Sequence, residues 1–255
     1  MTRRITEEWV IFCLAVQFLT RLPLARDGDW TADRMASTPR WYGVVGGIVG
    51  AISGIVYWGA ALVLPPLLAA LLAVAAAVIV TGALHEDGFA DFCDALGGSA
   101  EPDRALEIMR DSRIGTYGAL GLGILVAIKI ASLASLPAIL VPAVLISGHA
   151  LSRATLVVAV ATERYVRHEG LGKSVAAGPF DVGVACATAL AAFALLAVLS
   201  AESRIVLGLV GLTVGHLVIR RIFQRRLGGY TGDCLGALQQ SSETAFYLCL
   251  VVALG

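Results

Sequence analysis

The most unusual stretch of the sequence is HEDGFADFCD, residues 85–94, which lies within a segment without Lys or Arg, residues 41–103. Asp87, Asp91 and Asp94 are spaced i, i+4, i+7, so a helix that continued from the preceding apolar run would carry all three on one face. Carboxylates one turn apart repel, and the C-terminal end of a helix is already partly negative. The spacing therefore predicts a bound counter-charge.

A hard divalent cation is the counter-charge that this pattern favours. Oxygen ligands on one helix face, with positions left for water or phosphate, are how Mg²⁺ is held in many phosphoryl-transfer sites. Gly88 would allow a ligand or another backbone to approach closely. His85 could act as a base, as a partner of a metal ligand or only as an interfacial histidine. The alternative for the whole stretch is a plain acidic surface.

Two later segments place charged residues where predicted helices begin. In EIMRDSRIGTYG, residues 107–118, Arg110 and Arg113 flank Asp111. Guanidinium groups bind oxyanions with two donors and a helix N-terminus adds free N–H groups, so this loop is either a phosphate cradle or a capped helix start with topology-setting arginines. In GYTGDCLG, Asp233 is either an N-cap or a further metal ligand.

Two charged residues fall deep inside apolar segments. Arg153 and Glu243 lie about nine and ten residues from the same end of their predicted helices, which corresponds to a depth of roughly 13–15 Å. Ionisable groups within a membrane are costly and seek partners, so we expect the two to pair, or else to contact substrate independently. Lys129 is nearer the opposite end, and we expect it to snorkel toward the surface.

The segments that must position these residues are apolar throughout. Hydrophobic residues make up 58% of the chain and charged residues 15%, and the mean hydropathy is +0.82. We therefore expect an all-α polytopic integral membrane protein, with about seven or eight transmembrane helices in one bundle and residues 1–255 as a single domain. The formal net charge of zero argues against nucleic acid as a partner. The predicted spans are 41–64, 65–84, 115–136, 137–162, 180–200, 204–220 and 234–254, with 5–20 as a shorter span or an interfacial helix.

Positive charges alternate along the chain with short, nearly uncharged connections. By the positive-inside rule, the loops that carry them are cytoplasmic and the C-terminus is outside. The basic residues of these loops are Arg21, Arg26, Arg34, Arg40, Arg104, Arg110, Arg113, Arg164, Arg167, Lys173, Arg220, Arg221, Arg225 and Arg226.

Taken together, the motifs resemble the cobalamin synthase family, the adenosylcobinamide-GDP ribazoletransferases of the bacterial inner membrane. HxDGxxDxxD followed about twenty residues later by MRDSRxGTxG carries most of the specificity, and the remaining motifs occur in the family's order. The matching segments are FLTRLP at 18–23, HxDGxxDxxD at 85–94, EIMRDSRIGTYG at 107–118, Ser152-Arg153, EGLG at 169–172 and TGDxLGA at 231–237.

The resemblance implies a Mg²⁺-dependent transferase of vitamin B12 (cobalamin) biosynthesis, multi-pass in the inner membrane with cytoplasmic active-site loops. It would join α-ribazole or its 5′-phosphate to adenosylcobinamide-GDP, giving adenosylcobalamin or its 5′-phosphate and releasing GMP. By the same resemblance, the catalytic residues are His85, Asp91, Arg110, Asp111 and Arg113, the substrate-binding residues are Arg21, Arg153, Gly170, Gly172 and Glu243, and the metal ligands are Asp87, Asp91, Asp94 and Asp233.

Two other functions remain open at this stage. A membrane phosphotransferase of the CDP-alcohol type would use a similar carboxylate cluster, but residues 89–94 lack the arginine that its motif requires. A divalent-cation transporter would place its acidic ligands near the middle of the bilayer on several helices. The sequence also leaves open the preferred form of ribazole, the general base, the number of metal ions and whether the chain forms a homo-oligomer.

Overall fold

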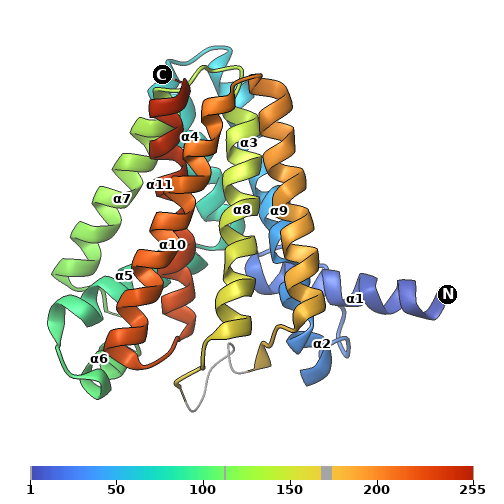
Figure 1. Cartoon of the computed structure of the whole chain (residues 1–255), viewed down its shortest axis with the longest axis vertical. Helices are drawn as coiled ribbons and strands as arrows, with labels where there is room; N and C mark the ends of the chain where they lie inside the picture. The colour runs from blue at the N-terminus through green and yellow to red at the C-terminus, as the bar shows by residue number, and fades with distance from the viewer. Residues whose placement is uncertain (1, 112, 168–173, 255) are drawn as a thin grey trace.

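The computed structural model describes residues 2–111, 113–167 and 174–254, and it is built from helices joined by short loops (Figure 1). One isolated bridge, between Tyr165 and Tyr230, joins two loops. The long helices are α1 (Thr2–Leu19), α3 (Tyr42–Ala61), α4 (Pro66–Thr81), α5 (Leu84–Gly98), α7 (Thr116–Ala134), α8 (Val141–Thr162), α9 (Pro179–Ser200), α10 (Val206–Leu227) and α11 (Gly232–Leu254). Short helical turns are α2 (Ala32–Ala36), η1 (Thr38–Trp41), α6 (Pro102–Ile108) and η3 (Ser203–Ile205).

Among the described residues, fewer helices are apolar enough to cross a membrane than the seven or eight expected. Five qualify, and the bent pair α4 and α5 would make six if counted as one span. The segment predicted at 234–254 is a helix of full length, α11, but the polar run Gln239 to Glu243 keeps it out of the apolar class. The all-α, membrane-spanning architecture is as expected, and α11 reaches through it by packing inside the bundle.

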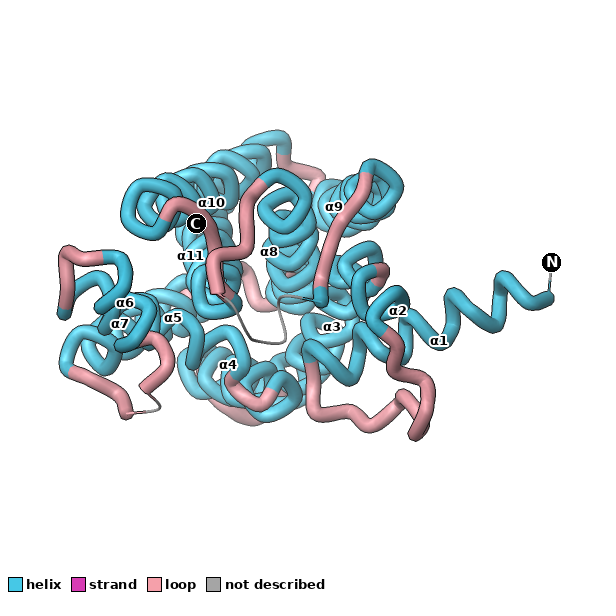
Figure 2. The backbone as a smooth tube through the Cα atoms, turned by 90° about the horizontal axis from the view of Figure 1, so that it is seen from below, coloured by secondary structure: helices cyan, strands magenta, loops and turns pink. Residues whose placement is uncertain are grey.

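Helices α8 and α11 occupy the middle of the bundle (Figure 2). Helix α8 packs on α3, α9 and α11, while α11 also contacts α5, α7 and α10. Glycines allow the closest of these approaches. A Cβ added to Gly46 of α3 would lie 2.1 Å from the backbone oxygen of His149 in α8, which no side chain can tolerate. Polar residues of α8 and α11 are thereby enclosed by protein and kept out of lipid.

The two ends of the bundle differ in character (Figure 1). One end, which we call the hairpin end, carries the short connections α3–α4, α7–α8 and α9–α10. The other, which we call the loop end, carries α2, α5, α6 and the longer basic loops. Four segments lie at the loop end: the acidic stretch 85–94, the loop that carries Arg110, the loop that carries Arg167 and the start of α11 with Asp233. The fold thus brings these motifs to one side of the membrane.

Helix α1 lies across the loop end and projects beyond the bundle (Figures 1 and 2). It is not among the apolar spans, and ion pairs from Glu7 to Arg34 and from Glu8 to Arg40 hold it. Ile5 and Trp9, which stand one turn apart on the projecting half, are 64% and 61% exposed. An exposed apolar stripe with tryptophan on a helix lying across the spans is typical of an interfacial helix. Of the two alternatives for residues 5–20, the geometry favours this one.

The helix expected to continue from 65–84 through the acidic stretch is broken instead. Gly82 and Ala83 both adopt left-handed backbone angles, with φ of 66° and 61°, and α5 leaves α4 at 92°. Asp87 therefore lies in the first turn of a new helix, where the helix dipole favours a negative charge. The earlier expectation that the acids sit at a helix C-terminus is wrong. The sequence could not show it, because Ala83 has no preference for this conformation.

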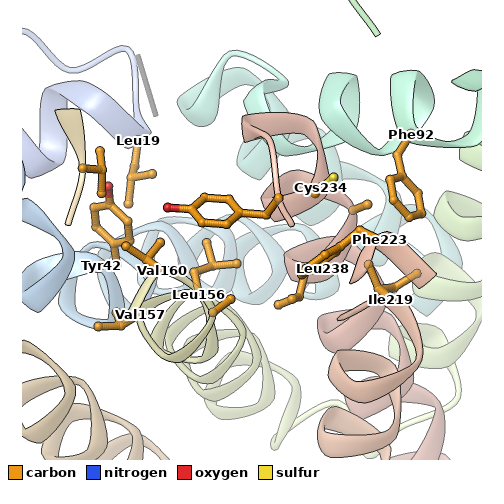
Figure 3. Packing of buried hydrophobic residues seen from close by; sticks show 14 of the residues in the cluster. Leu19, Tyr42, Phe92, Leu156, Val157, Val160, Ile219, Phe223, Cys234 and Leu238 are labelled. Carbon is orange, nitrogen blue, oxygen red and sulfur yellow. The ribbon is translucent and has the colours of Figure 1, made fainter. Parts of the chain in front are cut away.

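A cluster of buried apolar side chains underlies the loop end (Figure 3). It draws on helices that are distant in sequence, and Leu19, Tyr42, Phe92, Leu156, Phe223 and Leu238 are among its members. These side chains are almost fully buried. The cluster therefore forms a rigid base for the polar residues above it.

Candidate functional site

The acidic residues meet where α5 crosses α11. A Cβ on Gly236 would lie 2.9 Å from the backbone oxygen of His85 and 3.1 Å from the Cα of Gly88. A Cβ on Gly88 would in turn lie 3.0 Å from the Cα of Asp233. Because both helices carry glycine at the crossing, Asp233 comes alongside Asp87 and its neighbours. This crossing is what joins motifs separated by about 150 residues of sequence.

A cavity of about 260 Å³ opens beside the crossing. Its polar lining consists of His85, Asp87, Arg167 and Asp233, with the phenol-bearing residues Tyr42 and Tyr165 also on its wall. Its apolar lining comes from the cluster of Figure 3 and adjoining residues, including Leu19 and Leu156. A few charged groups on an otherwise apolar wall are typical of a ligand site.

The carboxylates at the crossing repel one another. The pKa of Asp91 is raised to about 7, first by burial and then by the charges of Asp233 and Asp87. Burial also raises the pKa of Asp233, while its ion pair with Arg167 opposes that shift. A cation placed among these oxygens would remove the repulsion.

Arg167 places a positive charge beside these acids, and the sequence analysis gave it no role beyond topology. Its terminal nitrogen donates to Asp233 Oδ2 at 2.6 Å. Its Nε is buried without a hydrogen-bond partner, although the side chain lines the cavity. The sequence around Arg167 resembles any other basic loop, so only the folded arrangement singles it out.

The donors fit a hard cation in their chemistry but are not assembled around one. Asp87, Asp91 and Asp233 offer only oxygen ligands, which Mg²⁺ prefers. Within residues 2–111, 113–167 and 174–254, however, no three acidic, histidine or cysteine side chains converge on one ion position. Asp233 is turned toward Arg167 instead. A metal bound at this crossing would share Asp233 with that ion pair.

Asp94, the third predicted acid of α5, uses its carboxylate for another purpose. Its two oxygens accept hydrogen bonds from the backbone N–H groups of Gly115 and Gly118, at 2.7 and 2.8 Å. A Cβ at Gly118 would fall 2.2 Å from one of these oxygens, so only glycine allows the contact. Asp94 therefore fixes the start of α7 against α5. It also occupies two of the N–H groups that were expected to face phosphate.

The charged residues of the predicted arginine loop lie in two different environments. Asp111 and Arg113 form an exposed ion pair in which two guanidinium nitrogens contact the carboxylate, and hydrogen bonds from Arg113 lower the pKa of Asp111 to about 2. This pair lies beside a separate shallow hollow that Asp94 also lines. Arg110 is exposed, and its charge acts on the phenol of Tyr165 at the cavity wall. Of the three, Arg110 is the residue whose charge reaches a side chain of the cavity wall, although burial, Arg167 and Asp233 affect the pKa of Tyr165 more.

Glu243 is the centre of a polar network in the bundle interior. Its carboxylate accepts from Lys129 Nζ at 2.7 Å and lies 3.0 Å from His149 Nδ1 and 3.7 Å from the Arg153 guanidinium. The expected pairing of Arg153 with Glu243 is confirmed, although Arg153 is not the nearest cation. Lys129 is 4% exposed, so the expectation that it snorkels is wrong. Neither Arg153 nor Glu243 is among the described residues that line the cavity.

The network reaches the acidic stretch through Glu86. Gln240 joins the two, since its amide oxygen accepts from Lys129 and its amide nitrogen donates to Glu86 Oε1 at 2.8 Å. Consecutive residues of α5 thus belong to different groups: Glu86 to the interior network and Asp87 to the cavity. The sequence analysis gave Glu86 no role, because the motif HxDGxxDxxD leaves its position free.

The remaining predicted substrate-binding residues are placed only in part. The Arg21 side chain lies over the bend between α4 and α5, where a Cβ on Gly82 would be 2.4 Å from its Nε. Arg21 is exposed there, beside the start of α5. Gly170 and Gly172 lie outside the described residues.

Comparison with known proteins gives a consistent result. The family model described as Cobalamin-5-phosphate synthase matches residues 11–251. Proteins named Adenosylcobinamide-GDP ribazoletransferase are similar over nearly the whole chain: that of Leptothrix cholodnii is 41% identical over 249 residues, covering 93% of each chain. Those of Shewanella pealeana and Shewanella frigidimarina are 39% and 37% identical, covering 95% and 96% of this chain and 95% of each relative. No solved structure gives a significant match.

Proposed function

The chain belongs to the cobalamin-5-phosphate synthase family, and we propose that it carries out the adenosylcobinamide-GDP ribazoletransferase reaction at the crossing of α5 and α11. The observation that carries the proposal is the meeting of Asp87, Asp91 and Asp233 with Arg167 beside one cavity. Carboxylates that repel one another, next to a guanidinium with a free donor, suit a metal-bound diphosphate.

In the proposed reaction, a hydroxyl of α-ribazole or its 5′-phosphate attacks the phosphorus that carries the cobinamide arm. The new P–O bond forms as the bond to the GMP oxygen breaks, and GMP leaves with the bonding electron pair. Mg²⁺, held by Asp87, Asp91 and Asp233, would supply charge neutralisation on the diphosphate oxygens. Arg167 and Arg110 would bind phosphate oxygens and hold the diphosphate in line for attack.

The attacking hydroxyl also needs a proton acceptor. His85 lines the cavity, and its Nδ1 is buried without a partner. Burial lowers the pKa of His85 well below its usual value, which keeps the ring neutral with an acceptor nitrogen and makes it a weak base in the ligand-free protein. We assign His85 this role within the proposal.

A divalent-cation transporter is disfavoured by the interior charges. Such a protein would need acidic ligands free near the middle of the bilayer. In the described structure Glu243 is already neutralised by Lys129 and Arg153, and Glu86 is hydrogen-bonded to Gln240. The acids with unbalanced charge lie at the loop end, beside an arginine suited to phosphate.

The test is direct assay of the purified protein in detergent. With Mg²⁺, adenosylcobinamide-GDP and α-ribazole, we expect GMP and the joined corrinoid in equal amounts, and no product when a chelator replaces Mg²⁺. A parallel assay with α-ribazole 5′-phosphate measures which acceptor is preferred. Absence of GMP with both acceptors would reject the reaction, whereas full turnover in chelator would reject only the metal.

We also propose that the loop end faces the cytoplasm of a bacterial inner membrane, as the basic loops indicate. Cys234 is fully buried, so native thiols are poor reporters. In a cysteine-free background, Asp103→Cys at the loop end should resist an impermeant thiol reagent in intact cells, and Ser135→Cys at the hairpin end should react. The opposite labelling pattern would invert the orientation.

A further inference from the structure

Arg167 and Asp233 form an ion pair where the proposed reaction needs both residues for other partners. The two side chains are 14% and 18% exposed, and the guanidinium reaches Asp233 Oδ2 at 2.6 Å. While this pair is closed, Asp233 Oδ2 is occupied and the guanidinium charge opposes a second cation at the carboxylate. No three ligands converge in the described structure, which agrees with Asp233 being held away.

The guanidinium of Arg167 is only partly used by this contact. One terminal nitrogen donates to Asp233, whereas the buried Nε has no hydrogen-bond partner. An unpaired buried donor on a partly buried cation is costly, so a second oxyanion is the expected occupant. Because Nε and a terminal nitrogen form a planar fork, the group best suited to them is a phosphate with two free oxygens.

We propose that Arg167 exchanges partners during the reaction cycle. Without ligand it neutralises Asp233, and with ligand it binds oxygens of the nucleotide diphosphate and releases Asp233 to the metal. This inference rests on the proposed function, since it identifies which residue links metal binding to diphosphate binding.

The exchange has a consequence for the order of binding. A free divalent cation must compete with Arg167 for Asp233, and it meets the repulsion of a nearby guanidinium. A cation that arrives with a diphosphate gives the guanidinium a new partner, so the competition disappears. The structure therefore assigns Arg167 a selective role, which is to favour the metal–diphosphate complex over metal alone.

The test separates metal binding from turnover by using Mn²⁺ alone as a spectroscopic probe. Wild-type protein in detergent should bind Mn²⁺ weakly, as measured by electron paramagnetic resonance. Arg167→Gln should bind it about tenfold more tightly, the size of effect that a positive charge about 6 Å from a divalent cation has at the dielectric constant of water. The same variant should lose on the order of 10²-fold or more in kcat/KM, because a charge-assisted phosphate contact is gone.

Two further variants make the result specific. Arg167→Lys keeps a positive charge beside Asp233 but lacks the planar fork, so Mn²⁺ affinity should stay near that of wild type while turnover falls. Arg104→Gln removes an arginine from an exposed ion pair with Glu107 at the same end of the bundle, and it should change neither quantity. A purely structural role for Arg167 would not make Mn²⁺ bind more tightly.

Unchanged or weaker Mn²⁺ binding in Arg167→Gln would overturn the exchange, and so would full activity in that variant. If the Gln variant does not fold, equal turnover of Arg167→Lys and wild type would overturn it as well. If Mn²⁺ binds to none of the proteins while GMP is still formed, the metal site of the proposed function fails, and the exchange fails with it.

Discussion

The interior network and the cavity group differ in how far their charges are balanced. In the interior, Lys129 and Arg153 face Glu243, and Glu86 joins them through Gln240. Around the cavity, the carboxylates of Asp87, Asp91 and Asp233 outnumber the cations that line it in the described structure, where Arg167 pairs with Asp233. The charges of the first group balance without a ligand, whereas the second retains repulsion that raises the pKa of Asp91.

The difference indicates what each group is for. A balanced and enclosed set of ions holds helices in register, because each member would be costly if left alone. An unbalanced set in a cavity is stabilised when a cation binds. Both groups begin in the first turn of α5, so the bend at Gly82 and Ala83 decides which acid joins which group.

The largest effect should come from breaking the interior group. Glu243→Leu leaves Lys129 and Arg153 without their shared anion, and we expect the free energy of unfolding to fall by roughly 3 to 5 kcal/mol. Combining it with Lys129→Met should recover part of that loss. Thermal unfolding in detergent measures both.

Glu202→Leu is the matched control, since Glu202 has an exposed 3.8 Å contact with Arg204 at the hairpin end. We expect a change of about 1 kcal/mol or less. If Glu243→Leu were as stable as this control, the interior group would not be structural.

Substitutions in the cavity group should lower activity and leave stability unchanged. Asp91→Asn removes a proposed metal ligand and should reduce turnover on the order of 10³-fold, which corresponds to about 4 kcal/mol. It should not lower stability, because it relieves repulsion from Asp87 and Asp233. A loss of stability like that of Glu243→Leu would show that the two groups do not differ in kind.

Asp94 tests the boundary between the groups, because it is an acid of α5 that already has backbone partners. Asp94→Asn keeps one acceptor oxygen and should cost about 1 to 2 kcal/mol of stability, since one of the two N–H groups of α7 loses its acceptor. Denaturant titration would detect this change. Loss of Mn²⁺ binding without loss of stability would instead assign Asp94 to the metal.

The smallest effect should be the coupling between Arg153 and Glu243. The two are 3.7 Å apart, and His149 lies closer to both, at 3.0 Å. A double-mutant cycle with Arg153→Met and Glu243→Leu should give a coupling of about 0.6 kcal/mol, near the average for hydrogen bonds in membrane bundles. The cycle that pairs Lys129→Met with Glu243→Leu should give a larger coupling energy, because that contact is shorter. Equal coupling energies would mean that the distances do not determine the strength of these two contacts.

The sequence predicted those features of the fold and the site that depend on a single helix or a single motif. The apolar segments gave the all-α membrane fold, the matching depths of Arg153 and Glu243 gave their contact, and the acid spacing gave a charged helix face. The motifs identified the family, which the comparisons confirm.

The rest depended on how separate segments meet. Gly82 can end a helix, but the residue type of Ala83 predicts neither its left-handed conformation nor a right-angle bend, and Lys129 could be assigned to the interior only once α7 was placed beside α11. Asp94 as a cap and Arg167 as the partner of Asp233 follow from contacts between distant loops. These contacts form only in the folded protein, and no pattern in the local sequence indicates them.

The position of Glu243 in the last helix has a consequence for how the protein is made. Synthesis proceeds from the N-terminus, so α7 and α8 are inserted before α11 has been translated. Lys129 and Arg153 therefore enter the membrane before their shared anion exists, at a cost of roughly 2.5 to 3.5 kcal/mol for each uncompensated charge on translocon scales. The bundle can close only when α11 arrives, and a chain that ends early presents unpaired cations to the cell's quality control.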